Sequence, residues 1–223
     1  MTMKADLLAA AFRLNMHRIN GLVRVLSSHD DLKSTAPLAS SSGVRADILR
    51  SVVVFLHATF EVVLRSHIPK PGRSLSFYSR TDLDKALKAS GIDATPFQIL
   101  YPPLTQMAKR RKRIVHEADL EHGEHRDWSV ADDWQLIMWL LAVPAFYHQL
   151  RISLGAEHEV SRAALHRLQT AMASHVEFGK QLVSFPVVPP ELRLQALQSV
   201  LGTLESIAST LQPDLLAPDS KNS

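Results

Sequence analysis

The apolar residues of this chain recur every three or four positions along most of its length, which is the pattern of amphipathic α-helices. Glycine is scarce and no segment alternates apolar and polar residues convincingly, so the sequence predicts no strand. A first helix is expected to end near Ser27, before a Ser-rich loop over residues 34–43. Its buried face is expected to carry Leu8, Ala11, Asn15, Ile19, Leu22 and Leu26.

A second helix is predicted from Val44 to His67. Its middle, residues 52–56, is very apolar, and the β-branched valines there leave a strand open as an alternative. Charged residues at helical spacing on both sides of this stretch, between Arg45 and Arg65, favour the helix. Residues 68–79 hold two prolines and a glycine, which predicts a long surface connection.

Two more helices are predicted before residue 120. Thr81-x-x-Asp84 has the form of a helix start, so a short helix is expected to reach Ala89. Thr95–Pro96 is a stronger start, because threonine can cap free backbone amides and proline suits the first helical position. The helix that follows is expected to run from Pro96 to Leu120, with Pro102–Pro103 delaying or kinking its beginning.

The last third of the chain predicts three further helices. Ser129-x-x-Asp132 should open a buried helix that reaches Leu150 and bends at Pro144. Helices over residues 157–182 and 190–211 are expected to follow. The final helix should bury Leu197, Val200, Leu201, Leu204, Ile207 and Leu211.

These elements together predict an all-α fold, an up-and-down helical bundle with additional C-terminal helices. We expect the bundle to occupy residues 1–154. Residues 155–212 should form a helical extension packed on the same domain, and residues 213–223 a flexible tail.

Composition and charge limit the possible partners. The formal charge is only +3 over 223 residues, so any attraction to nucleic acid must be local. The chain has no cysteine, which excludes disulfides and thiolate metal sites. The longest apolar run, Leu136–Phe146, is too short to span a bilayer, and the N-terminal residues make a poor signal peptide. We therefore expect a cytoplasmic protein without a membrane segment.

The densest positive charge is the run of five basic residues from Lys109 to Arg113, which is followed closely by His116. On a helix, Lys112 and Arg113 would flank His116, while Arg111 would point about 140° away from it. Cationic neighbours favour the neutral imidazole, which can act as a general base, and guanidinium groups bind phosphate. These parts are sufficient for metal-free RNA cleavage. The alternative is a solvated basic helix face that ends in a partly buried histidine.

The segment around this run resembles the signature of HEPN domains (higher eukaryotes and prokaryotes nucleotide-binding). Arg111 and His116 have the spacing Arg-x4-His, with Ile-Val before the histidine and Glu-Ala-Asp after it. Residues Arg50–Arg65 are similar to the Arg-x-(apolar)-His-Ala-x-x-Glu-x-x-x-Arg helix of some bacterial HEPN proteins. The resemblance covers roughly residues 7–154.

This resemblance implies a helical bundle that dimerises so that two motif helices face each other. Many members are metal-independent endoribonucleases of toxin–antitoxin, abortive-infection or other defence systems. Carried over, His116 would activate the ribose 2′-hydroxyl or orient the phosphate, and Arg111 would stabilise the pentacoordinate phosphorane, leaving a 2′,3′-cyclic phosphate. A second copy of the chain would bring the two residues together across a two-fold interface. The expected RNA phosphate contacts are Lys109, Arg110, Lys112 and Arg113.

The expected partners are RNA, a second copy of the chain and an antitoxin or defence-system protein, with no cofactor and no metal. HEPN members usually carry a small polar residue after the motif arginine, where this chain has Lys112. A lysine cannot accept a hydrogen bond, so it cannot orient a protonated imidazole. This departure favours an alternative, a non-catalytic HEPN-like module that binds nucleic acid or nucleotide or mediates assembly. A helical scaffold outside the family is a third possibility.

Other polar residues have two interpretations each. Glu61 either supports the motif residues or forms an i,i+4 ion pair with Arg65, and Asp119 is placed to hydrogen-bond His116 one turn away. His122-x-x-His125 has metal-compatible spacing, but the ligand pattern is incomplete, so a polar helix end is expected instead. Three tryptophans flank the apolar helix: base stacking is conceivable for Trp128, and core or dimer-interface positions are expected for Trp134 and Trp139.

Overall fold

The computed structural model describes residues 2–28, 43–68, 79–116, 120–121, 124–125, 130–155, 158–182 and 190–210. In chain order its helices are α1 (Thr2–Ser28), α2 (Gly43–His67), α3 (Arg80–Ala89), the 3-10 helix η2 (Thr95–Leu100), α4 (Tyr101–His116), α5 (Val130–Ser153), α6 (His158–Leu182) and α7 (Pro190–Thr210). A short antiparallel pair, β1 (Leu120–Glu121) and β2 (Glu124–His125), is an addition that the sequence did not predict. The all-α prediction is confirmed, and residues 52–56 are helical.

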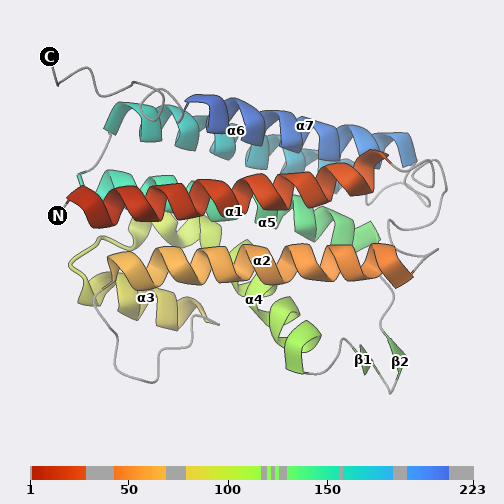
Figure 1. Cartoon of the computed structure of the whole chain (residues 1–223), viewed down its shortest axis with the longest axis horizontal. Helices are drawn as coiled ribbons and strands as arrows, with labels where there is room; N and C mark the ends of the chain where they lie inside the picture. The colour runs from red at the N-terminus through yellow and green to blue at the C-terminus, as the bar shows by residue number, and fades with distance from the viewer. Residues whose placement is uncertain are drawn as a thin grey trace, which may run out of the picture.

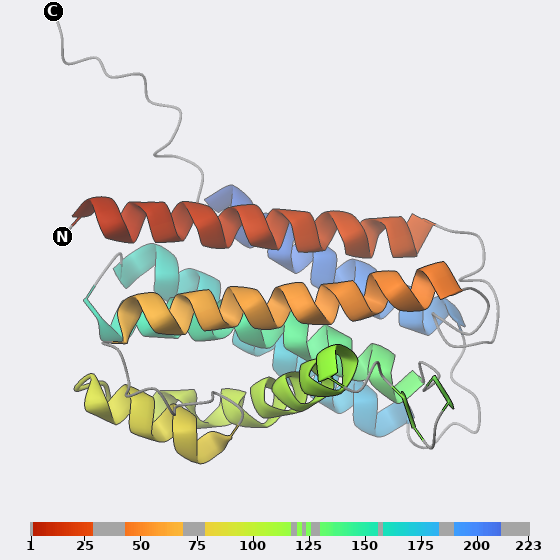
Figure 2. The same ribbon diagram turned by 60° about the horizontal axis from the view of Figure 1, so that its bottom comes forward.

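Helix α5 is the centre of the bundle, since it packs against α2, α4, α6 and α7. Every residue from Trp139 to Leu150 is buried, which is the property of a helix surrounded by others. Helices α1 and α2 lie side by side and run in opposite directions, and α4 lies on the side of α2 away from α1 (Figures 1 and 2). The buried helix predicted from Asp132 onward is therefore confirmed, and it continues through Pro144.

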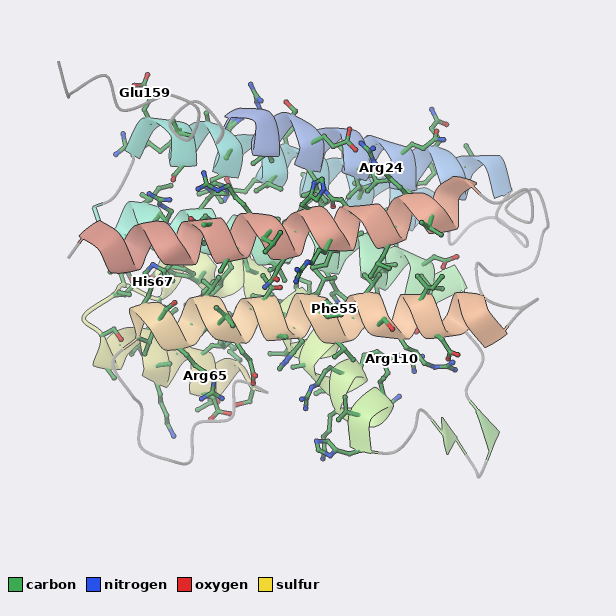
Figure 3. All side chains as sticks on the ribbon, viewed as in Figure 1. Arg24, Phe55, Arg65, His67, Arg110 and Glu159 are labelled. Carbon is green, nitrogen blue, oxygen red and sulfur yellow. The ribbon has the colours of Figure 1, made fainter. Side chains whose placement is uncertain are left out.

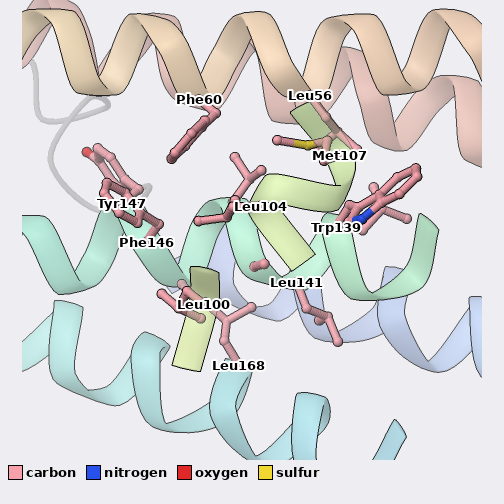
Figure 4. Packing of buried hydrophobic residues seen from close by; sticks show 14 of the residues in the cluster. Leu56, Phe60, Leu100, Leu104, Met107, Trp139, Leu141, Phe146, Tyr147 and Leu168 are labelled. Carbon is pink, nitrogen blue, oxygen red and sulfur yellow. The ribbon is translucent and has the colours of Figure 1, made fainter. Parts of the chain in front are cut away.

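Aromatic contacts join the surrounding helices to α5 (Figure 4). Phe146 of α5 meets Phe60 of α2 edge-on, with ring centroids 5.0 Å apart, and it meets Phe97 of η2 at 4.9 Å. Tyr147 stacks on Phe12 of α1 at 4.0 Å. Such ring pairs add about 1 kcal/mol each to the free energy that comes from burying their area.

The hydrophobic core is continuous across residue 154. It takes side chains such as Leu104 and Leu141 from the first part of the chain and Leu168 and Leu201 from α6 and α7. The predicted stripe of the last helix is confirmed at Leu197, Val200, Leu201, Leu204 and Ile207. The C-terminal helices α6 and α7 therefore cover α5 and complete one hydrophobic core with it.

The start of α3 differs from the prediction. Its N-cap is Ser79, whose Oγ accepts a hydrogen bond of 3.1 Å from the backbone N–H of Asp82. The sequence predicted that Thr81 begins the helix, because Thr81 and Asp84 are three residues apart, as Ser79 and Asp82 are. In the structure, Ser79 is the residue that accepts a hydrogen bond from a free backbone amide. Asp84 instead accepts a 2.6 Å hydrogen bond from the hydroxyl of Tyr101, which ties α3 to α4.

The helix predicted over residues 96–120 is shorter and begins differently. Thr95 does not cap it: its backbone N–H donates to Oδ1 of Asp93, and a 3-10 helix runs to Leu100. The α-helical part begins at Tyr101, so Pro102 and Pro103 fall in its first turn, where missing amides cost little. The delay attributed to this proline pair is confirmed.

The buried face of α1 is rotated from the predicted one. The buried residues of α1 are Phe12, Met16, Ile19, Asn20 and Val23, and of the predicted residues Ile19 is buried while Ala11, Asn15 and Leu22 are half-buried. Phe12 on this face stacks on Tyr147 of α5, and α2 and α7 also pack on α1, so the larger side chains bury more apolar area here. Most of the predicted loops over 34–43 and 68–79, the start at Ser129 and the tail over 213–223 lie outside the described residues.

Candidate nucleic-acid interface

The outer face of α4 carries an uninterrupted row of basic groups. Lys109, Lys112, Arg113 and His116 are all exposed, and their spacing of i, i+3, i+4 and i+7 confines them to an arc of about 100°. We call these four residues the α4 basic stripe. Figures 1 and 2 show α4 on the outer side of α2, with its last turns at the edge of the bundle.

The charge of this stripe is not compensated within its own helix. The sequence of α4 contains no aspartate or glutamate, so no i,i+4 ion pair forms along it. Arg113 and His116 lie in the last turn, where the carbonyl end of the helix dipole favours cations. The local structure therefore stabilises a concentration of positive charge that the chain as a whole lacks.

Arg110 differs from the rest of the basic run. Its side chain, labelled in Figure 3, is only 4% exposed, whereas that of the neighbouring Lys109 is exposed. Residue 110 stands about 100° from residue 109 on the helix, which turns it toward the bundle. A buried guanidinium requires compensation in the folded chain, so its position fits a structural role and departs from the predicted phosphate contact.

Arg111 is half-buried, and its charge acts on a histidine of the neighbouring helix. His57 of α2 is 1% exposed, and α2 packs against α4. Burial, and next the positive charge of Arg111, lower the pKa of His57 from 6.5 to about 4. At neutral pH the motif arginine therefore lies near an uncharged imidazole.

Within one chain the fold does not point Arg111 and His116 to the same side. Both belong to α4, so five helical residues separate their directions by about 140°. His116 is in the outer stripe, while Arg111 is partly covered. Sequence reasoning missed the proximity of His57 and Arg111, although His57 belongs to the segment that resembles HEPN proteins.

Glu61 forms the local ion pair that its spacing predicts. Its Oε1 lies 3.8 Å from a guanidinium nitrogen of Arg65, an exposed side chain labelled in Figure 3. An exposed pair of this kind contributes at most a few tenths of a kcal/mol. Asp119, the other proposed supporting residue, lies outside the described residues.

The outward face of α2 carries large apolar side chains. Phe55, labelled in Figure 3, is 52% exposed, and Val62 is 42% exposed. Their spacing of seven residues puts them on the same side of the helix. Val115, at the end of α4, is also exposed. Single exposed apolar residues are ordinary, but these lie on the two helices that hold the motif residues.

The other candidate residues are placed as follows. Trp139 is in the core, and Trp134 packs against His175 and Phe178 of α6. Trp128 and His122 lie outside the described residues, as does the side chain of His125. Across the described ranges, no three histidine or carboxylate side chains gather into a possible metal site. None of the described helices combines the length and apolarity needed to cross a membrane.

A scan against models of protein families, a search of curated proteins and a search of solved structures found no match to this chain.

Proposed function

We propose that this protein is a metal-independent endoribonuclease of HEPN type that acts as a homodimer. The observation that carries the proposal is the α4 basic stripe, which aligns His116 with three exposed cations on one helix face. In a toxin–antitoxin or defence system, such an enzyme would work in the cytoplasm and be restrained by a partner protein.

The three cations of the stripe account for RNA attraction. Lys109, Lys112 and Arg113 span the last two turns of α4 with no carboxylate on that helix. Each phosphate they neutralise releases condensed counterions, which provides affinity without sequence preference. RNA held along this face has its backbone next to His116.

The cleavage step requires one base and one anion stabiliser. His116 takes the proton of the ribose 2′-hydroxyl, and the resulting oxygen attacks the adjacent phosphorus. The bond to the 5′-oxygen breaks, and that oxygen takes a proton from solvent water as it leaves. Arg111 stabilises the negative charge of the phosphorane by donating paired hydrogen bonds. The products are a 2′,3′-cyclic phosphate and a 5′-hydroxyl.

A second chain can bring together the two motif residues, which point in different directions within one chain. Because Arg111 and His116 diverge by about 140° on α4, each site would take Arg111 from one chain and His116 from the other. The exposed apolar residues Phe55 and Val62 of α2 support a contact between copies beside α4.

The direct test is cleavage of labelled single-stranded RNA in EDTA, with detection of 2′,3′-cyclic phosphate ends. We expect His116→Ala to lower the rate by about 100-fold or more, since the general base is removed. The matched control is His17→Ala, an exposed histidine of α1. No cleavage by the unaltered protein, or equal cleavage by His116→Ala, would rule out the enzyme.

The alternative is a non-catalytic HEPN-like module that binds nucleic acid. The exposed Lys112 favours it, because an ammonium adds phosphate affinity but cannot accept a hydrogen bond from His116. Salt-sensitive RNA binding without cleavage in the same assay would identify this function.

A further inference from the structure

Helices α6 and α7 enclose an open groove of about 880 Å³ that is unrelated to the α4 basic stripe. We call it the α6–α7 groove. It runs from Arg167 and Ser206 at one end to Phe178 and Leu192 at the other. Figure 1 shows α6 and α7 at the edge of the bundle opposite α4, with α5 packed against both α4 and α6.

One end of the groove is closed by a side-chain link. A guanidinium nitrogen of Arg167 donates a 2.9 Å hydrogen bond to Oγ of Ser206, which joins the two helices. From Arg167 to Phe178, α6 rises by about 16 Å. The groove therefore has the length of an elongated small molecule, and its volume lies in the range of small-molecule sites.

The lining favours an anion. None of the described residues that line the groove is acidic, while Arg167 and His166 stand at one end. Serine and threonine side chains from both helices line its middle. The hydroxyls of Ser174 and Thr203 already donate to backbone carbonyls, whereas those of Thr170 and Ser199 can donate to a ligand. A guanidinium with nearby hydroxyl donors is the arrangement that binds phosphate or carboxylate.

The opposite end carries a buried polar ring. His175 lines the groove and is only 7% exposed. Its ring packs edge-on against Trp134 at 5.7 Å, with Phe178 half-buried beside the same tryptophan. The imidazole nitrogens are therefore placed at the wall of the groove, where a ligand can donate to one and accept from the other.

Burial lowers the pKa of His175 below 6.5, so the ring is neutral at physiological pH. A neutral imidazole offers one N–H donor and one acceptor nitrogen. This end therefore suits a flat ring with its own polar atoms better than it suits a second charge.

We propose that the α6–α7 groove binds a small organic anion, with a planar ring against His175 and Phe178 and a phosphate or carboxylate at Arg167. This site is independent of RNA cleavage, since it shares no residue with the α4 basic stripe. It also gives α6 and α7 a role beyond completing the core.

The sharpest test fills the groove without disturbing the fold. Gly202 lines it, and a Cβ built on Gly202 meets nothing within 4 Å, so Gly202→Met places a side chain in the groove. Gly21 of α1 is equally open, which makes Gly21→Met the matched control. Both changes replace a helical glycine with a better helix former, so both variants should fold.

Binding is measured by calorimetry with two probes, adenosine 5′-diphosphate and 1-naphthaleneacetate, which carry a phosphate and a carboxylate. We expect at least one to bind with Kd on the order of 10–100 µM. Gly202→Met should weaken that binding at least tenfold, and Gly21→Met should leave it unchanged. The probe that binds identifies the preferred anionic group. If neither binds below about 1 mM, or if Gly202→Met binds as tightly as the unaltered protein, the proposal is wrong.

Two further variants locate the ring and the anion. His175→Phe keeps the packing on Trp134 but removes both ring nitrogens, and Arg167→Gln removes the charge. Each should weaken binding about tenfold, whereas Arg162→Gln, an exposed arginine of α6 outside the lining, should not. Adenosine and inorganic phosphate each supply only half of the ligand and should bind far more weakly than the diphosphate.

Discussion

Helices α4 and α5 pack against each other but place their polar groups in opposite surroundings. The α4 basic stripe is exposed, whereas α5 holds His148 with no accessible surface and no hydrogen bond from either ring nitrogen. On α4 a histidine among cations can meet a ligand. On α5 a buried histidine destabilises the fold if it is charged, so the folded chain keeps it neutral. The difference shows that burial, and not residue type, separates the candidate chemistry from the core.

The largest expected effect tests whether two chains share each proposed catalytic site. If each site takes Arg111 from one chain and His116 from the other, Arg111→Ala and His116→Ala are each inactive alone. Mixing the two variants and allowing subunit exchange should restore about a quarter of the original rate, because half the dimers carry one intact site.

The complementation is measured as release of 2′,3′-cyclic phosphate ends after exchange. A mixture that stays as inactive as its components would place the site within one chain. A mixture of His116→Ala with the double variant Arg111→Ala/His116→Ala is the control, since it has no intact site.

The buried histidines should make stability depend on pH. Burial, followed by the charge of Arg151, lowers the pKa of His148 to about 4, and His57 is lowered similarly. Below pH 6.5 the unfolded chain binds protons that the folded chain does not, so stability falls as pH drops from 6.5 toward 4. Each histidine should reduce the free energy of unfolding by about 2 kcal/mol between pH 7 and pH 5.

Urea unfolding at pH 7, 6 and 5 measures this loss. His148→Leu should remove about 2 kcal/mol of the dependence between pH 7 and pH 5, because leucine fills a similar volume and leaves no titrating group at this position. His17→Leu, at an exposed position, should leave it unchanged. An unaltered slope in His148→Leu would contradict the assignment of the pH dependence to buried imidazoles.

The next prediction is that Arg110 of α4, like the buried residues of α5, contributes to stability. Arg110→Met should lower the free energy of unfolding by about 3 kcal/mol, because it removes a buried charge and leaves its compensation unmatched. Arg113→Met, three residues further along α4 on the exposed stripe, should change it by about 0.5 kcal/mol or less.

Denaturant unfolding and RNA binding of both variants separate the roles. If Arg110→Met keeps its stability and loses RNA affinity as Arg113→Met does, Arg110 is a phosphate contact as first predicted. If Arg110 has a structural role, Arg110→Met should lose stability and keep its RNA affinity.

The sequence predicted the helices well because apolar periodicity records which side of each helix is buried. It failed where neighbouring residues are chemically alike. Ser79 and Thr81 are both good caps, and only the path of the chain selects Ser79. The five residues of the basic run look equivalent in sequence, but rotation of α4 against the bundle buries Arg110 and exposes Lys109.

The parts of a site that depend on two helices could not be predicted from one segment. His57 and Arg111 are more than fifty residues apart, and their proximity follows from how α2 packs on α4. The α6–α7 groove depends likewise on the spacing of two helices, so His175 and Gly202 gave no signal in the sequence.

The smallest expected effect is a change in how RNA binding depends on salt when the exposed α4 basic stripe loses charge. Lys109→Gln with Lys112→Gln removes two charges from the α4 basic stripe, and Lys85→Gln with Lys88→Gln removes two exposed charges from α3. Both double variants change the net charge equally, so a general effect of charge would weaken RNA binding equally. If the stripe holds the RNA backbone, only the α4 variant should flatten the plot of log affinity against log salt, by about 1.4 in slope for single-stranded RNA. Equal slopes for the two variants would show that RNA senses the overall charge of the protein and not the face that carries His116.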